Sequence, residues 1–357
     1  MNLKRKLLLL ETFRTLVTIV IALLIGYIIL FFSTDEPLNA FKWFLVGPVS
    51  KTRRFVEFLN QTTPLIFTGL AVSIVFQAEI FNIGAEGQMF MGAVGATFAA
   101  LHFPSVPFLH PILVMIFAMF VGGLWASVPA VMKAKWRASE LVSSLMMNYI
   151  AFFLGLYIVN YYMRDLRAGY LVSYKYPKTA WLPKLIHIRY NLHIGIAIAL
   201  GFAILTWFFL YRTKYGYEIR MTGFNRGFAI FSGIKVENVE MYSQIISGMI
   251  AGLAGSIEMM GLYRRFVWQV SPGYGFDGII VALLARNNPL GVIPAALLVG
   301  YMRTGAYIMG RLSGVAPEIV KMLQSMIILL ITAEAFLGFM RRKIIEKEAM
   351  RMESGGA

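Results

Sequence analysis

The sequence predicts an all-α fold, a polytopic bundle of transmembrane helices with about ten membrane crossings, some of them made by broken helices. Composition is the first reason: 58% of the 357 residues are hydrophobic, 14% are charged, and the mean hydropathy is +0.68. A single soluble core of this length cannot bury so much apolar surface, so a bilayer must solvate it. The second reason is that apolar runs of about 20 residues, long enough to span a hydrocarbon core, recur along the chain.

The first crossing is expected at Thr15–Ser33, directly after a basic N-terminal stretch. Its apolar run is long and no small-residue cleavage site follows it, so we interpret it as an uncleaved anchor. The short apolar run Gly278–Ala285 cannot cross alone and is counted as a broken crossing. The remaining candidates are Thr62–Ala78, Glu86–Phe103, Pro111–Met132, Leu141–Tyr162, Leu192–Tyr211, Met241–Leu262, Pro289–Met309 and Pro317–Met340.

Basic residues between the runs predict the orientation, because Lys and Arg concentrate in cytoplasmic loops. With the N-terminus inside, Lys133–Arg137 and Arg212–Arg226 fall on the cytoplasmic side, and an even number of crossings also places Arg341–Lys343 there. The predicted organisation is a cytoplasmic tail (1–14), a transmembrane domain (15–340) and a second cytoplasmic tail (341–357) of a cell-membrane protein. The segment 164–189 disagrees with this orientation. It holds six Lys or Arg residues and one acidic residue, Asp165, yet counting the crossings places it outside.

Several function classes are excluded or disfavoured by what the sequence contains. The net charge of +15 lies mostly between apolar runs, which is typical of loops that face anionic lipid and not of a nucleic-acid-binding face. The chain has no cysteine and no GxxxxGK[ST] motif, so thiolate sites and a P-loop of its own are excluded. No metal, cofactor or catalytic triad is expected. The four histidines, His102, His110, His187 and His193, lack metal-site spacing and are interpreted as interfacial.

Polar residues gather between the second and third expected crossings, in FQAEIFNIGAEGQMFMG from Phe76. Gly84 and Gly87 allow the backbone to break, and a broken helix at membrane depth normally lines a cavity or a protein interior. One interpretation is that Asn82, Glu86 and Gln88 line a translocation path. The alternative is a cytoplasmic turn, with Glu86 and Gln88 at a helix N-terminus, where an acid is favourable.

Two further patterns concern helices expected to be buried. In SSLMMNYIA, Ser144 and Asn148 are four residues apart and share one helix face, so Asn148 can bind a polar solute or hydrogen-bond a neighbouring helix. In Met241–Leu262, small residues repeat at four-residue spacing, which favours close helix packing. Glu258 on that helix is then expected in the bundle interior.

The loop GFNRGFAIFSGI, Gly223–Ile234, carries Phe224, Phe228 and Phe231 at i, i+4 and i+7. These spacings predict one short helix with three phenyl rings on one side. Such a helix suits docking into a groove of a soluble partner. The alternative is a helix that lies on the lipid surface.

These features together favour a transporter, of which two kinds remain open. Acidic residues at membrane depth mark proton relays in ion-driven carriers, so a secondary transporter that uses Glu79, Glu86 and Glu258 is one possibility. The other is a permease whose energy comes from a separate protein, as the absence of a P-loop implies.

Four segments in order resemble the branched-chain amino-acid and ribose type of ABC permease, specifically its nucleoside and simple-sugar import subgroup. They are FNIGAEGQMFMGAVGA from Phe81, SSLMMNYIA from Ser143, GFNRGFAIFSGI from Gly223 and GYGFDGIIVALLARNNPLG from Gly273. The resemblance covers most of the chain from about Thr62 onward. It implies an inward-directed permease that works by alternating access and has no catalytic residues.

The resemblance also implies partners and roles for residues. The partners are a second, homologous permease subunit, a cytoplasmic ABC ATPase that binds the ATP, and an extracytoplasmic solute-binding lipoprotein. The coupling helix that such permeases insert into the ATPase carries over onto the 223–234 loop, where small residues usually stand in place of Phe228 and Phe231. The expected pathway residues are Asn82, Glu86, Gln88 and Asn148, and the expected coupling residues are Gly223, Phe224, Arg226, Phe228, Phe231 and Gly233.

Overall fold

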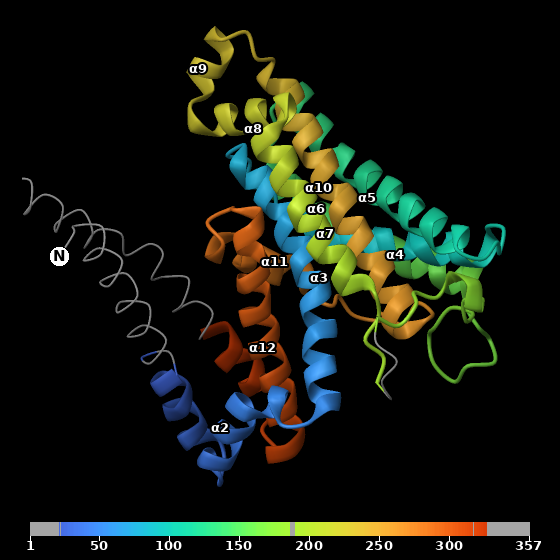
Figure 1. The fold of residues 1–357 in the computed structure, drawn as a ribbon, viewed down its shortest axis with the longest axis vertical. Helices are drawn as coiled ribbons and strands as arrows, with labels where there is room; N and C mark the ends of the chain where they lie inside the picture. Colours follow the sequence, from blue (N-terminus) through green and yellow to red (C-terminus); the bar gives the residue numbers. More distant parts are fainter. Residues whose placement is uncertain (1–20, 22, 186–189, 317, 327–357) are drawn as a thin grey trace, which may run out of the picture. The chain divides into compact units, whose positions relative to one another are not determined.

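The computed structural model describes residues 21, 23–185, 190–316 and 318–326. That part of the chain consists of helices and their connections, and its only extended pairings are two isolated β-bridges (Figure 1). The all-α prediction is confirmed. The longer helices are α2 (Pro37–Val46), α3 (Thr52–Gln77), α4 (Ala85–His102), α5 (Leu109–Trp136), α6 (Glu140–Ile158), α7 (Gly195–Arg212), α8 (Lys214–Phe224), α10 (Val236–Glu258), α11 (Tyr274–Leu284) and α12 (Pro289–Ser313). The short ones are η1 (Gly47–Val49), η2 (Val159–Met163), η3 (Lys178–Ala180), α9 (Arg226–Phe231) and η4 (Met259–Tyr263).

Six helical stretches among the described residues are long and apolar enough to cross a membrane. They are Thr52–Gln77, Leu109–Trp136, Glu140–Met163, Gly195–Arg212, Val236–Tyr263 and Pro289–Ser313, and each overlaps one predicted crossing. Shorter apolar helices lie at Leu23–Ser33 and Tyr274–Leu284. The predicted crossing Pro317–Met340 and both predicted tails lie mostly or wholly outside the described residues. The multi-pass fold is confirmed, and the count of ten crossings stays a prediction.

The chain divides into two compact units. The larger is Lys51–Tyr301, and the smaller combines the segments 1–50 and 302–357. In the described part of the smaller unit, α2 packs closely on the end of α12, since a Cβ at Gly305 would overlap the backbone oxygen of Phe44. All the predicted pathway and coupling residues belong to the larger unit.

Helix α3 begins at Thr52, earlier than the predicted Thr62. The additional turns are polar in sequence, but Val56, Phe58 and Asn60 on them are buried. The Asn60 side chain also donates a hydrogen bond from Nδ2 to the backbone oxygen of Asn191, at 3.0 Å. Contacts with protein therefore stabilise this part of the helix, which is why a hydropathy boundary misses it.

The core of the larger unit is built on close approach of α4, α5 and α10. A Cβ at Gly252 of α10 would overlap the Ala118 carbonyl oxygen of α5, and one at Gly92 of α4 would overlap the backbone of Gly252. Likewise Gly255 faces the Met89 carbonyl oxygen of α4. The packing role predicted for the small residues of this helix is confirmed, because any larger side chain would separate the backbones.

The α6–α7 connection and the residues after α10 form one ordered structure at the end of the larger unit opposite α8 and α9 (Figure 1). We call the segments Arg164–Leu185 and Met259–Gln269 the basic platform. The Ser173 amide donates to the Phe266 carbonyl at 3.1 Å, and the Arg264 guanidinium lies 4.0 Å from the centre of the Trp181 ring. Tyr176 is buried and its hydroxyl lies 2.7 Å from that of Thr97 on α4, and burial raises the pKa of Tyr176. The platform is thus fixed to the helical core.

Two of the histidines predicted at span ends are buried there against protein. His110 Nδ1 lies 2.9 Å from the Thr179 hydroxyl, and His193 Nδ1 accepts a hydrogen bond from the Gly195 amide at 3.1 Å. Burial lowers the pKa of His193 to about 4, so its imidazole is neutral at pH 7. His102 is exposed, and His187 lies outside the described residues.

Candidate functional site

A polar break interrupts the helical backbone between α3 and α4, at Ala78–Gly84, where the glycines predicted one. Inside it, Glu79 adopts a left-handed conformation with φ of 60°. Asn82, which is 2% exposed, holds the break from within: its Oδ1 accepts a hydrogen bond from the Gly84 amide at 2.6 Å. Its Nδ2 donates to Gln244 Oε1 on α10 at 3.0 Å. The amide of Asn82 therefore fixes both the start of α4 and its distance from α10.

Helix α6 binds further backbone groups at the break and at the start of α4. The Asn148 side chain donates from Nδ2 to the Ile83 carbonyl at 3.0 Å and accepts at Oδ1 from the Gly87 amide at 2.8 Å. The Ile83 amide donates to the Ser144 hydroxyl at 3.1 Å. The prediction that Ser144 and Asn148 share a face is confirmed. Both are occupied with the backbone of a neighbouring segment, the interhelical use that was one of the two alternatives for Asn148.

Glu86, in the first turn of α4, joins α4 to α11. Its Oε1 accepts hydrogen bonds from the Ser271 hydroxyl and, at 2.7 Å, from the Gly273 amide, while Oε2 accepts from the Gly275 amide at 2.6 Å. The carboxylate therefore lies at the N-terminal ends of two helices, where the unpaired amides and the helix dipole favour a negative charge. Only glycine fits at 275, because a Cβ there would overlap the backbone of Glu86.

Gln88 differs from the other three expected pathway residues. It is 1% exposed, and no hydrogen-bond partner of its side-chain oxygen Oε1 lies within reach. An unsatisfied buried amide oxygen costs about 1–3 kcal/mol, so its presence requires an explanation. Asn82, Glu86 and Asn148 by contrast have their oxygens engaged by the protein. Glu258 is buried in the bundle interior, as predicted.

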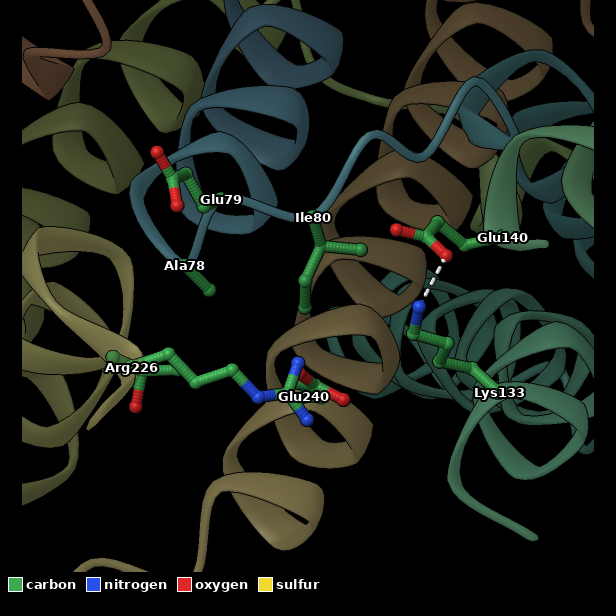
Figure 2. A pocket seen from close by; sticks show the side chains of 8 residues that line it. Ala78, Glu79, Ile80, Lys133, Glu140, Arg226 and Glu240 are labelled. Carbon is green, nitrogen blue, oxygen red and sulfur yellow. Dashed lines mark hydrogen bonds and ion pairs between the residues drawn. The ribbon is translucent and has the colours of Figure 1, made fainter. Parts of the chain in front are cut away.

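A charged pocket of about 80 Å³ lies beside the break. It is lined by Ala78, Glu79, Ile80, Lys133, Glu140, Thr222, Arg226 and Glu240 (Figure 2). Two ion pairs face it: Lys133 Nζ lies 2.8 Å from Glu140 Oε2, and Arg226 Nη1 lies 2.6 Å from Glu240 Oε1. The first joins the ends of α5 and α6, and the second joins α9 to α10. Within the described residues, no group of His, Asp and Glu could hold a metal ion.

The segment with the expected coupling residues is two helices, which corrects the single helix predicted over Phe224–Phe231. Helix α8 ends at Phe224, and Asn225 has extended backbone angles and accepts a hydrogen bond at Oδ1 from the Phe228 amide at 2.9 Å. Asn225 thereby caps a new helix, α9, so Phe224 and the other two phenylalanines do not share a helix face. A left-handed Gly233 ends the segment.

The phenylalanine side chains of α8 and α9 are not covered by the rest of the chain. Phe224 is 86% exposed, Phe228 52% and Phe231 94%. Gly223 lies against the carbonyl oxygen of Gln77, the last residue of α3, so the exposed rings are held beside the polar break. Arg226 points toward Glu240, with which it forms an ion pair (Figure 2).

Some residues of this arrangement were not anticipated from the sequence, chiefly Glu240, Gln244 and Ser271. Glu240 and Gln244 are four residues apart on α10, a spacing that signals one polar face on an otherwise apolar helix. Ser271 precedes the Gly273 and Gly275 pair that opens α11, and that glycine pattern indicates a close backbone approach without naming its partner.

Comparison with known proteins identifies the family. Residues 54–332 match the family model described as the branched-chain amino acid transport system permease component. Guanosine ABC transporter permease protein NupP of Bacillus subtilis is 33% identical over 94% of this chain and 97% of its own. Glucose ABC transporter permease protein TsgB13 of Haloferax volcanii is 31% identical over 89% and 87%.

A further relative comes from the same Bacillus strain as NupP. Guanosine ABC transporter permease protein NupQ is 27% identical over 80% of this chain and 91% of its own. The family model matches most of the chain, and the two relatives over 30% identical cover nearly all of it. This multi-pass membrane protein therefore belongs to the family of permease components of the branched-chain amino acid transport type.

Proposed function

We propose that this chain is the permease subunit of an ABC importer that moves a nucleoside or a simple sugar inward across the cell membrane by alternating access. The observation that carries the proposal is the similarity along nearly the whole chain to permeases named for guanosine and for glucose. A separate ATPase supplies the energy, and the permease itself performs no covalent chemistry. The substrate class rests on these names, so nucleosides and sugars are both tested below.

The ATPase is the partner of the α8–α9 segment. Solvent-exposed phenylalanines cost free energy unless a partner covers them, and aromatic residues are enriched in the centres of protein interfaces. Three such rings on two short helices beside the polar break support a docking role for Phe224, Phe228 and Phe231, with Gly223, Arg226 and Gly233 shaping the segment. Because the ATPase is cytoplasmic, α8 and α9 face the cytoplasm in this proposal, and both termini of the chain are cytoplasmic.

The basic platform then faces outward and supports a binding-protein partner. Its two segments hold seven Lys or Arg side chains against Asp165: Arg164, Arg167, Lys175, Lys178, Lys184, Arg264 and Arg265. Anionic lipids account for basic residues mainly on the cytoplasmic side of a membrane. An excess of basic residues on the outer side therefore favours binding to an acidic protein surface. We assign the platform to the solute-binding lipoprotein. The pair NupP and NupQ, both similar to this chain, supports a second permease polypeptide as the remaining partner.

The ion-driven alternative has less support in the geometry of two of its three carboxylates, Glu79 and Glu86. Glu79 is exposed, and Glu86 is held by three donors at two helix ends. The Glu86 carboxylate thus serves as a link between α4 and α11. The permeases similar to this chain are named as ABC transporter components, which also favours the importer.

Gln88 is the residue that we assign to contact with the solute. Nucleosides and sugars carry hydroxyl and amine donors that can satisfy its buried Oε1, whereas the other three pathway candidates already serve the protein. Gln88→Leu should therefore raise the KM for uptake about tenfold, the effect of one lost hydrogen bond near 1.4 kcal/mol, with the melting temperature unchanged or raised. The measurement is uptake of radiolabelled guanosine and of glucose into proteoliposomes. If the variant kept the wild-type KM for both guanosine and glucose, Gln88 would not be a pathway residue.

Copurification tests the proposed function itself. The tagged chain, extracted in mild detergent from its native host, should retain a second permease and an ATPase, and the complex should hydrolyse ATP. A solitary chain that drives proton-dependent uptake after reconstitution would overturn the proposal in favour of the ion-driven carrier.

A further inference from the structure

A continuous series of polar contacts leads from the α8–α9 segment to the polar break. Arg226 Nη1 pairs with Glu240 Oε1 at 2.6 Å. One turn further along α10, Gln244 donates from Nε2 to the Glu240 carbonyl at 3.2 Å. Gln244 Oε1 in turn accepts from Asn82 Nδ2 at 3.0 Å. Every step is within direct hydrogen-bond distance, so no bridging water is needed.

The series continues past the break into two helices. Asn82 Oδ1 accepts from the Gly84 amide at the start of α4. Two residues on, the carboxylate of Glu86 accepts from the Gly273 and Gly275 amides of α11. The two helix N-termini beside the expected pathway are thus connected, through side chains and through the backbone of Glu240 and of residues 84–86, to a residue of the proposed docking segment.

The burial of each residue in the series determines how the series responds when Arg226 moves. The Arg226 side chain is 55% exposed, whereas Glu240, Gln244 and Asn82 are 5%, 0% and 2% exposed. The outer end is therefore open to a docking protein, whereas Gln244 and Asn82 cannot exchange their partners for bulk water. Displacing Arg226 must either carry Glu240 and α10 with it or leave a buried carboxylate unpaired, which costs several kcal/mol.

We propose that Glu240 and Gln244 are positioning residues that transmit movement of α9 to the N-terminal ends of α4 and α11. This inference rests on the proposed function, because it takes the ATPase as the source of the movement. The other ion pair of the pocket, Lys133 with Glu140, joins α5 to α6 and is not a member of the series (Figure 2). It fixes the far wall of the pocket while Arg226 and Glu240 form the transmitting side.

The test compares Gln244→Leu with wild type in the complete complex, reconstituted with its ATPase and binding protein. Leucine keeps a similar volume but removes both hydrogen bonds of the side chain, while the Arg226–Glu240 pair remains. We expect the variant to assemble and hydrolyse ATP near the wild-type rate, with solute moved per ATP falling about fivefold or more, the range of measured coupling between sites. A wild-type ratio would overturn the inference.

A second pair of variants addresses the other member. Glu240→Leu should lower the ratio to a similar extent, and Glu240→Gln should keep much of it, because the amide still accepts from Arg226. Combining Glu240→Leu with Gln244→Leu should lower the ratio no further than either alone, since both interrupt one series. Fully additive losses would contradict the inference that Glu240 and Gln244 belong to one series. The matched control is Glu237→Leu, an exposed residue in the first turn of the same helix, which should leave the ratio unchanged.

A spectroscopic readout separates transmission from a structural defect. The chain contains no cysteine, so a single introduced thiol can be labelled selectively. Val270 is 73% exposed and precedes Ser271, the residue bonded to Glu86. A fluorophore on Val270→Cys should respond to ATP binding in the complex, and Gln244→Leu should abolish the response. A retained response in that variant would overturn the inference, whereas failure of the wild-type chain to bind an ATPase would instead overturn the proposed function.

Discussion

Glu86→Ala is expected to lower the free energy of unfolding by about 3–5 kcal/mol, because it leaves three donors at two helix ends without their acceptor. Each hydrogen bond to a charged group contributes about 1.5–3 kcal/mol, and the two backbone amides are fixed, so they cannot turn to another partner. For a chain of this size the melting temperature should fall by roughly 5 °C. Thermal unfolding of the purified chain in detergent measures the effect without any partner.

Glu86→Gln should recover only part of this loss. One amide oxygen still accepts from one side, but the Nε2 group that replaces the other oxygen is a donor facing donors. Glu237→Ala, an exposed acid in the first turn of α10, is the control and should change the melting temperature little. If Glu86→Ala instead melts like wild type and only uptake falls, Glu86 acts as a pathway residue and not as the link between α4 and α11.

Phe231→Asp is expected to abolish recovery of the ATPase with the chain while leaving the chain folded. The ring is 94% exposed, so the substitution removes no packing within the larger unit. A central aromatic residue of an interface contributes about 2 kcal/mol or more, so the dissociation constant should rise about 30-fold or more. Binding of the purified ATPase to the chain in nanodiscs measures it directly, and Phe228→Asp should act in the same direction.

The control for this substitution is Phe108→Asp. Phe108 is 90% exposed and precedes α5 at the end away from Lys133, so it is equally open but remote from α8 and α9. Its replacement should leave ATPase binding unchanged. Equal losses from both substitutions would assign the effect to general surface polarity and remove the docking role from α9.

The helical fold follows from hydropathy because membrane-spanning helices must be both long and apolar. The same rule fails where protein replaces lipid as the surroundings. Helix α3 extends back to Thr52 because Asn60 and its neighbours are covered by the chain, and a hydropathy average does not register that cover. Glycine patterns were more informative, since Gly84 marked the break before α4 and the small residues of α10 marked its close packing.

The candidate site was predictable residue by residue but not as an arrangement. Asn82, Glu86, Gln88 and Asn148 were expected because polar groups at membrane depth need a reason to be there. Which group each one contacts depends on segments far away in sequence, such as Gly273 for Glu86, and no local pattern encodes that pairing. The single helix expected over Phe224–Phe231 failed for a local reason: Asn225 offers the backbone a cap that competes with continuing the helix.

The sharing of Glu86 by two helices also orders the biogenesis of the protein. The residue is separated by 187 positions from its partner Gly273, so α4 is synthesised long before α11. Until then its carboxylate has none of those donors, and only water or the insertion machinery can solvate it. A nascent chain that stops before Ser271 therefore holds an uncompensated charge at the start of α4. Truncations that end before Ser271 should then be recognised by membrane quality control through this uncompensated carboxylate, whereas truncations after Gly275 keep all three donors.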